Sequence, residues 1–204
     1  MIVVDTEYTC WKDSLLTGWA DSSRPREIVQ IAAIRLDDDL REVEAMQVFA
    51  RPSINPGLSQ FFTELTGITQ ERIDAEGVPF VDALDRFLAF AGMEPIVCMN
   101  SDGAVMAECA ARAGIQIDLP RFHRLRPFLE ACGIDVGGLS SGDLHMLTPT
   151  PLEGRAHDAL HDVRSMATWL ANARHEGLYH GPWELPSELP RTDPRIADAA
   201  AGRR

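Results

Sequence analysis

The chain has 204 residues, of which 45% are apolar and 25% charged, so it is long enough to form one domain with a well-packed core. Its 31 aspartates and glutamates outnumber its 19 lysines and arginines, which gives a formal net charge of −12. Proteins that coat long tracts of duplex neutralise phosphates with basic residues, so this charge argues against that class. If nucleic acid is a ligand, the composition favours contact with a few nucleotides at one end.

The composition also bears on where the protein works. No run of residues approaches membrane-spanning length, and Asp5 interrupts what would be the apolar region of a signal peptide. The four cysteines contain no Cys-x-x-Cys pair and no histidine at zinc-finger spacing. We therefore expect a cytoplasmic protein with reduced thiols and no membrane partner, with Cys98 and Cys109 in its core.

The apolar pattern predicts strands and helices in an alternating order. Strands are expected at residues 1–4, 27–36, 42–50 and 95–99. Helices are expected at 60–65, 70–76, 81–91, 102–113, 140–146 and 159–175, with either another helix or a strand–helix piece at 120–132 that Pro127 interrupts. This order predicts an α/β domain, residues 1–180, with a mixed sheet flanked by helices. The Pro- and Ala-rich remainder, residues 181–204, is expected to be an extended tail with a disordered end.

Two carboxylates continue the first strand at alternate positions, directly after its apolar residues. Side chains two apart on a strand point to the same face, so Asp5 and Glu7 are expected to lie a few ångströms apart. Like charges held so close resist burial unless a cation sits between them, and a divalent ion is the usual solution. Taken alone, the pair is more simply an exposed acidic turn.

Further candidate ligands lie downstream. Asp102 follows a predicted buried strand where a helix begins, a place that suits either a site residue or a helix cap. His157 and His161 are four apart and could bind zinc on one helix face, although no third His or Cys stands at a persuasive spacing. Alternatively, His157 leads into the helix and places a base beside an inward Asp162. Either histidine alone is more simply a surface residue.

Together these residues resemble a known family. Asp5-Thr6-Glu7, Asp102 twelve residues before Gly114, and His157-x4-Asp162 are similar to the three motifs of the DEDDh 3′→5′ exonucleases, of the RNase H-like superfamily. The resemblance includes segments 27–33, 65–69 and 157–162 and extends from residue 1 to about 176. The long loop after Glu7, which carries Trp11 and Trp19, is most similar to the branch that trims histone messenger RNA and small RNAs. The two tryptophans either dock on the body or contact a flat ligand.

The sequence departs from the family at one motif. Asn100-Ser101-Asp102-Gly103 lacks the aromatic residue that several relatives place just before the motif Asp. A shift of two would place Ala104 at the ligand position and imply an inactive protein. The distance to Gly114 and the apolar Met106 favour Asp102 instead.

The resemblance implies an RNase H-like fold with a mixed five-stranded sheet and a specific site. Two Mg²⁺ or Mn²⁺ ions would be held by four carboxylates: Asp5, Glu7, Asp102 and Asp162. His157 would be the general base, Thr6 would lie near the terminal 3′-hydroxyl, and Leu65 would pack on the terminal base. The implied activity is removal of 5′-mononucleotides from single-stranded RNA or DNA 3′ ends. Two alternatives stay open: a non-catalytic protein that binds an RNA end or a protein partner, and a zinc hydrolase using His157 and His161.

Overall fold

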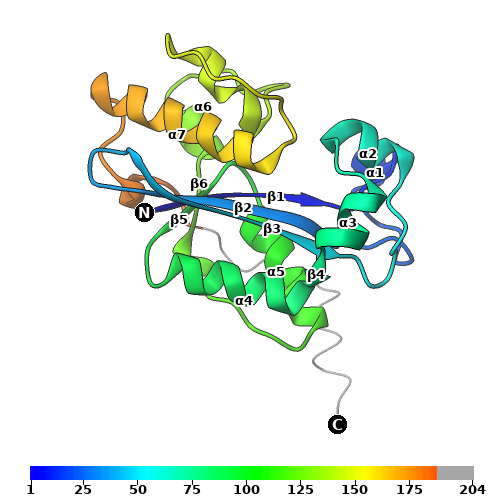
Figure 1. Cartoon of the computed structure of the whole chain (residues 1–204). Helices are drawn as coiled ribbons and strands as arrows, with labels where there is room; N and C mark the ends of the chain where they lie inside the picture. Colours follow the sequence, from blue (N-terminus) through cyan, green and yellow to red (C-terminus); the bar gives the residue numbers. More distant parts are fainter. Residues whose placement is uncertain (188–204) are drawn as a thin grey trace.

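One mixed sheet organises the protein, a computed structural model of which describes residues 1–187 (Figure 1). The strand order is β4-β3-β2-β1-β5-β6. The strands are β1 (Ile2–Tyr8), β2 (Ile28–Leu36), β3 (Glu42–Arg51), β4 (Val78–Pro79), β5 (Ile96–Cys98) and β6 (Phe122–Arg124). The helices are α1 (Ser14–Thr17), α2 (Gln60–Thr66), α3 (Gln70–Glu76), α4 (Phe80–Ala91), α5 (Asp102–Arg112), α6 (Arg126–Ala131) and α7 (Ala159–His175). Short 3₁₀ helices are η1 (Leu119–Arg121), η2 (Ser141–Leu147) and η3 (Pro182–Glu184).

The central strand β1 has a different partner on each side. It runs antiparallel to β2 over its whole length, from Ile2 opposite Arg35 to Tyr8 opposite Ile28. It runs parallel to β5 only at Ile2 and Val3. The second half of β1 therefore has a free edge on the β5 side, and the carboxyl ends of both strands reach the same end of the sheet.

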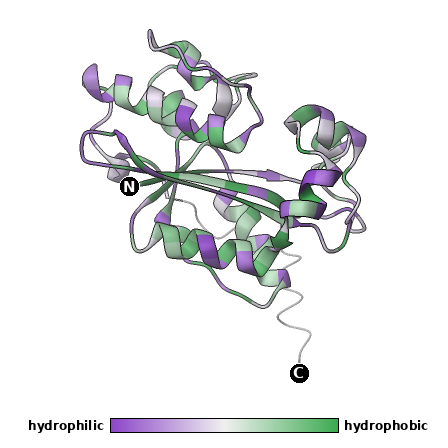
Figure 2. Ribbon diagram, in the orientation of Figure 1, coloured by the Kyte–Doolittle hydropathy of each residue, from purple (hydrophilic) through white to green (hydrophobic). Residues whose placement is uncertain are grey.

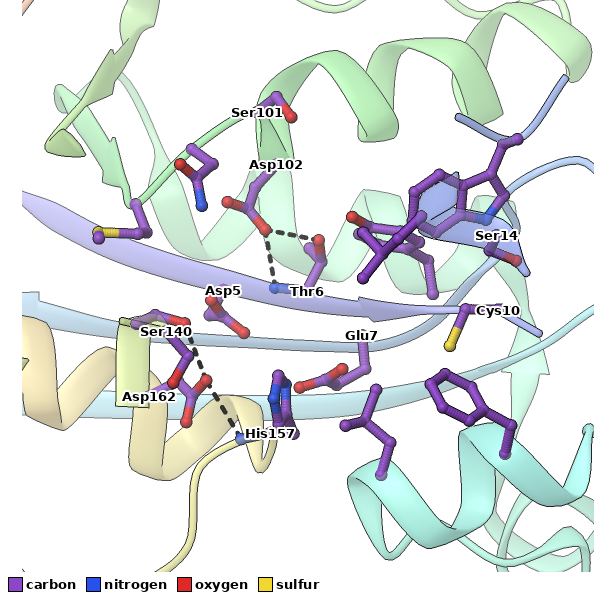
Figure 3. Close-up of a pocket in the computed structure, with 18 of the residues that line it drawn as sticks. Asp5, Thr6, Glu7, Cys10, Ser14, Ser101, Asp102, Ser140, His157 and Asp162 are labelled. Carbon is purple, nitrogen blue, oxygen red and sulfur yellow. Dashed lines mark hydrogen bonds between the residues drawn. The ribbon is translucent and has the colours of Figure 1, made fainter. Parts of the chain in front are cut away.

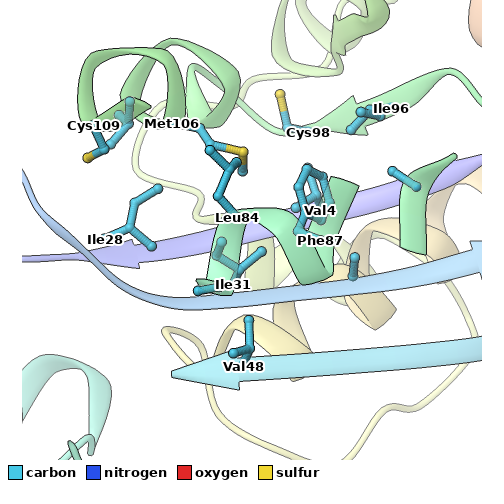
Figure 4. Packing of buried hydrophobic residues seen from close by; sticks show 14 of the residues in the cluster. Val4, Ile28, Ile31, Val48, Leu84, Phe87, Ile96, Cys98, Met106 and Cys109 are labelled. Atoms are coloured by element: carbon cyan, nitrogen blue, oxygen red, sulfur yellow. The ribbon is translucent and has the colours of Figure 1, made fainter. Parts of the chain in front are cut away.

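Helices cover both faces of the sheet (Figure 1). On one face, Ile2 and Val4 pack with residues of α4 and α5, including Phe87 and Met106 (Figure 4). On the other, Val3 packs with residues of α7, including Val163, Met166, Trp169 and Leu170. The strands are accordingly mostly hydrophobic in Figure 2, whereas the helices mix both kinds of residue. Burial of each large aliphatic side chain stabilises the fold by about 1.5–3 kcal/mol.

A third, smaller cluster lies under α2 and α3. It joins Cys10 and Val29 to Phe62, Ile68 and Ile73, all of them buried. Ser59 caps α2 by accepting the Phe62 N–H, and Thr69 caps α3 by accepting the Arg72 N–H. The two helices therefore hold the loop after β1 against the end of the sheet where that strand's carboxylates lie.

The mixed α/β architecture agrees with the prediction, and three details differ. The sheet has six strands rather than five, because the short β4 and β6 extend its edges. Pro127 does not interrupt a helix but lies in the first turn of α6, where the missing N–H costs nothing. Of the expected tail, residues 181–187 contact the body through the buried Leu185 and a bridge between Ser187 and His123. The expected disordered end lies outside the described residues.

Two further expectations can be compared with the structure. Cys98 and Cys109 are both buried in the core on the α4–α5 face, as predicted. Between residues 1 and 187, no helix is both long enough and apolar enough to cross a lipid bilayer.

Candidate active site

The acidic pair of β1 lies on the face that α7 covers. Asp5 and Glu7 alternate with Thr6, so they share the face of Val3, which belongs to the α7-side core. Both side chains are buried, at 6% and 8% exposure. In Figure 3 they point toward Asp162 and His157. The pair is therefore a buried cluster rather than an exposed acidic turn.

Asp102 reaches this cluster from the other side of β1. It is the first residue of α5, and Ser101 occupies the cap position. Its Oδ1 accepts two hydrogen bonds from Thr6, one from the hydroxyl at 2.8 Å and one from the backbone N–H at 3.2 Å. Since β5 pairs with β1 only at Ile2 and Val3, the Thr6 N–H at the free edge is available for this contact. Thr6 therefore fixes the orientation of Asp102, and both of its donors are engaged there.

Asp162 and His157 meet at the start of α7. Asp158 caps that helix by accepting the Leu160 N–H, and His157 precedes it with a left-handed backbone at φ 66°. That conformation directs the His157 N–H toward Asp162 Oδ2, at 3.4 Å. Ser141 donates its hydroxyl to the same oxygen at 2.8 Å. The second oxygen, Asp162 Oδ1, is buried and has no hydrogen-bond partner among the described residues.

Two glycines let the surrounding loops approach α7 closely. A Cβ on Gly142 would lie 2.4 Å from Asp162 Oδ1, and a Cβ on Gly154 would lie 2.2 Å from His161 Nδ1. His161 is buried, and its two ring nitrogens face the carbonyl oxygens of Glu153 and Gly142 at 3.2 and 3.1 Å. The expectation of a surface His161 is therefore wrong, and because each ring nitrogen already faces a carbonyl oxygen, the geometry does not support its pairing with His157 at a zinc ion. His161 instead ties two loops to the helix.

Burial raises the pKa of all four carboxyl groups, and repulsion within the cluster adds to the shift at Asp5 and Glu7. Burial, followed by the charges of Asp102, Asp162 and Glu7, raises the pKa of Asp5 well above its usual range. Burial and the same kind of repulsion raise the pKa of Glu7. Burial also raises the pKa of Asp102, against the hydrogen bonds from Thr6, and raises the pKa of Asp162 to about 6.

His157 shifts in the opposite direction. Burial is the main cause that lowers its pKa below 6.5, and Arg155 lowers it further, against the opposing effect of Asp143. The imidazole is therefore neutral around pH 7, which is the form that accepts a proton.

The donor set fits a divalent cation. One ligand atom each from Glu7, His157 and Asp162 lies within 4.8 Å of the others. Asp162 Oδ1 lacks a partner, and the carboxylates repel one another, so a cation here would satisfy an orphaned atom and relieve like-charge repulsion. A set dominated by carboxylate oxygens suits hard ions such as Mg²⁺ or Mn²⁺ better than zinc.

The cluster lies in a cavity of about 380 Å³, here called the site cavity, which has two different walls. Asp5, Glu7, Asp102, Asp162 and His157 line it together with Ser140 and Ser141. The apolar and aromatic lining consists of Tyr8, Trp11, Leu15, Trp19, Phe61, Leu65 and Met99. All seven predicted site residues, Thr6 and Leu65 among them, therefore line this one cavity.

Two residues that hold parts of the site were not predicted from the sequence. Ser141 binds Asp162 from a position 21 residues earlier in the chain. Arg155 donates to the carbonyl oxygens of Leu65 and Glu64, at 2.7 and 3.2 Å, and so joins the His157 loop to the end of α2. A basic residue suits the C-terminus of a helix, but nothing in the sequence pairs these two segments.

Known proteins share both the sequence and the fold. The family model described as "Exonuclease" matches residues 2–170. ERI1 exoribonuclease 2 of Xenopus laevis is 36% identical over 88 residues, which are 43% of this chain and only 12% of that relative.

Solved structures extend the similarity to nearly the whole chain. The nuclease domain of 3′hExo, a DEDDh family member, bound to rAMP, has a TM-score of 0.72 and 18% identity, covering 93% of this chain and 96% of that one. A 3′-exonuclease that recognises the 3′ end of a histone mRNA stem-loop has a TM-score of 0.74 and 17% identity. The similarity covers 92% of this chain and 89% of that one. With four carboxylates and a histidine in one cavity, the chain belongs to the exonuclease family, with the RNase H-like fold of the DEDDh exonucleases.

Proposed function

We propose that the protein is a metal-dependent 3′→5′ exonuclease that removes 5′-mononucleotides from single-stranded nucleic-acid 3′ ends. The observation that carries this proposal is that four buried carboxylates and His157 line one cavity, where one buried carboxylate oxygen has no partner among the described residues. Buried like charges without a counter-ion are costly, so a fold that gathers four of them is arranged for a cationic ligand.

The metal ligands in this proposal are Asp5, Glu7, Asp102 and Asp162, holding two Mg²⁺ or Mn²⁺ ions. When bound, such ions neutralise the carboxylates and stabilise the negative charge that develops on a phosphoryl group in transfer. Thr6 holds Asp102 in place through its hydroxyl and N–H, and Ser141 holds Asp162. These contacts fix carboxylate positions before any substrate arrives.

His157 acts as the general base. Its neutral ring accepts a proton from the attacking water as the water oxygen bonds to phosphorus. The bond between phosphorus and the O3′ of the preceding nucleotide breaks, so the products are a 5′-mononucleotide and a strand shortened by one. The backbone N–H contact to Asp162 Oδ2 positions the loop that carries the imidazole.

The substrate end is held by the rest of the site cavity. We place the terminal 3′-hydroxyl near the edge of β1 at Thr6 and the terminal base against Leu65, which lines the apolar wall. A single-stranded end suits a protein of net charge −12, because stacking supplies affinity that basic residues do not. The names of the similar proteins, an exoribonuclease and an exonuclease bound to rAMP, make RNA the first substrate to test.

A digestion panel tests this proposal. Single- and double-stranded RNA and DNA are incubated with Mg²⁺, Mn²⁺ or chelator, and products are resolved to the nucleotide. We expect mononucleotide release from single strands, dependent on the ion and absent in Asp162→Ala. Binding of the strands without hydrolysis under any ion would instead identify a non-catalytic protein of this fold.

A further inference from the structure

The two tryptophans in the loop between β1 and β2 have different roles. Trp19 is held by the protein: its Nε1 donates to the Thr9 carbonyl at 3.2 Å, and its ring meets Tyr8 edge-on with centroids 5.6 Å apart. The Arg26 guanidinium lies over the same ring, 5.6 Å from the centroid. Trp19 also packs against the core cluster under α2 and α3. Trp19 is therefore a docking residue.

A cation lies over the ring of Trp11. The Arg24 guanidinium lies over its ring, 5.4 Å from the centroid, and ion pairs with Asp13 and Asp21 hold Arg24. The backbone N–H of Trp11 donates to Ser14 Oγ at 2.8 Å, which fixes the turn into α1. Among residues 1–187, Trp11 does not belong to any of the three core clusters or to the residues packed against them. The ring nevertheless lines the site cavity.

The position of this loop suits contact with a base. In Figure 3, Cys10 and Ser14 lie beyond Glu7, on the side away from Asp162, so the loop closes the apolar end of the cavity. A phosphate held at the carboxylates would carry its nucleoside toward one of the cavity walls. The apolar lining offers a flat, half-buried indole as well as the aliphatic Leu65. Ser101, which also lines the cavity, is too small to stack.

We propose that Trp11 is the stacking platform for the base of the 3′-terminal nucleotide, with the base held between the indole and Leu65. This inference rests on the proposed exonuclease function and assigns to it a specificity residue. Arg24 lies over the ring but does not line the site cavity, so it restrains the indole and little side-chain freedom is lost when a base stacks on it. Stacking accepts any base, so Trp11 serves a sequence-tolerant activity.

The test compares Trp11→Ala and Trp11→Phe on two substrates. One is a single strand with an ordinary 3′-terminal nucleotide, and the other ends in an abasic nucleotide. Stacking of one base contributes about 1–3 kcal/mol, so we expect Trp11→Ala to raise KM about 5- to 150-fold on the first substrate and to leave KM unchanged on the second. Trp11→Phe keeps an aromatic ring, so its KM should stay close to that of the wild type. Trp183→Ala, at a 75% exposed tryptophan that does not line the site cavity, is the matched control.

Two results would overturn the assignment. If Trp11→Ala leaves KM unchanged on the ordinary strand, the ring does not contact the base. If KM rises equally on both substrates, Trp11 only supports the loop. Failure of the proposed function is separately visible, because the wild-type protein would then release no mononucleotide. In that case, fluorescence anisotropy measures binding of both labelled strands to Asp162→Asn, with and without Trp11→Ala. If the ordinary strand binds more tightly than the abasic strand and Trp11→Ala removes this difference, the stacking platform is supported. If Trp11→Ala leaves binding unchanged, the platform is refuted.

Discussion

Replacing Asp162 with asparagine should stabilise the metal-free protein at neutral pH while abolishing hydrolysis. The Asp162 side chain is buried, and its Oδ1 has no partner in the described part of the chain. Burial raises its pKa from 3.8 to about 6, which corresponds to about 3 kcal/mol of unfolding free energy at 1.36 kcal/mol per pH unit. Asparagine removes the charge and still accepts the Ser141 hydrogen bond.

The pH dependence follows from the sign of that shift. A carboxyl group with a raised pKa in the folded state contributes stability that is fully present below pH 3.8 and lost as pH rises through 6. At pH 7 without metal, the wild-type protein has lost that contribution. At roughly 2–4 °C per kcal/mol for a chain of this size, Asp162→Asn should then melt about 6–12 °C above wild type.

Thermal denaturation in chelator from pH 4 to pH 8 measures this difference. The Tm of Asp162→Asn should exceed that of wild type increasingly as pH rises toward 7. Mg²⁺ should raise the wild-type Tm at pH 7.5 and raise the variant's Tm far less. Asp85→Asn, at an exposed position on α4, is the control and should follow wild type. Parallel Tm curves for wild type and Asp162→Asn would refute the reasoning.

Other predictions concern residues around the same carboxylate. His157→Ala should lower kcat by about 10²- to 10⁴-fold with KM nearly unchanged; steady-state kinetics check this, and a change in KM alone would remove the general-base role. Because burial lowers the pKa of His157, wild-type activity should persist below pH 6.5 and fall only as the imidazole is protonated, which a pH–rate profile measures. Gly142→Ala should abolish activity, since its Cβ would meet Asp162 Oδ1 at 2.4 Å, whereas Gly57→Ala, with open space around its Cβ, should be silent. Arg155→Ala should raise KM about fivefold, as expected for about 1 kcal/mol from an exposed hydrogen-bonding side chain; an unchanged KM would mean that its link to α2 does not position the substrate wall.

The acidic pair shows which parts of the site can be predicted from local sequence patterns. Strand alternation predicted that Asp5 and Glu7 share a face, and the buried strand before Asp102 made that residue a candidate for the site or for a helix cap. These are local patterns, so they can be recognised in one sequence. The residues that hold the carboxylates depend instead on distant contacts: Thr6 binds Asp102 across 96 residues, and Ser141 binds Asp162 across 21.

His161 shows why a helical pattern can mislead. Leu160 and Val163 indicated that Asp162 lies nearer the inner side of the helix than His161, yet both side chains are buried. The 3₁₀ helix η2, which carries Gly142, covers α7 at His161, because the Gly142 carbonyl faces the His161 ring and this side of the helix is buried as well. Periodicity reports which side of a helix faces the core, and it does not report what a loop covers.

The most direct test follows a single strand labelled at its 5′ end, with its 3′-hydroxyl either free or blocked. With Mg²⁺ or Mn²⁺, the wild-type protein should shorten the free strand in one-nucleotide steps from the 3′ end and leave the blocked strand intact. Asp5→Asn, which removes one charge from the carboxylate cluster, should produce no ladder from either strand. Internal cuts in the blocked strand, or an equal ladder from Asp5→Asn, would contradict a 3′→5′ exonuclease built on these carboxylates.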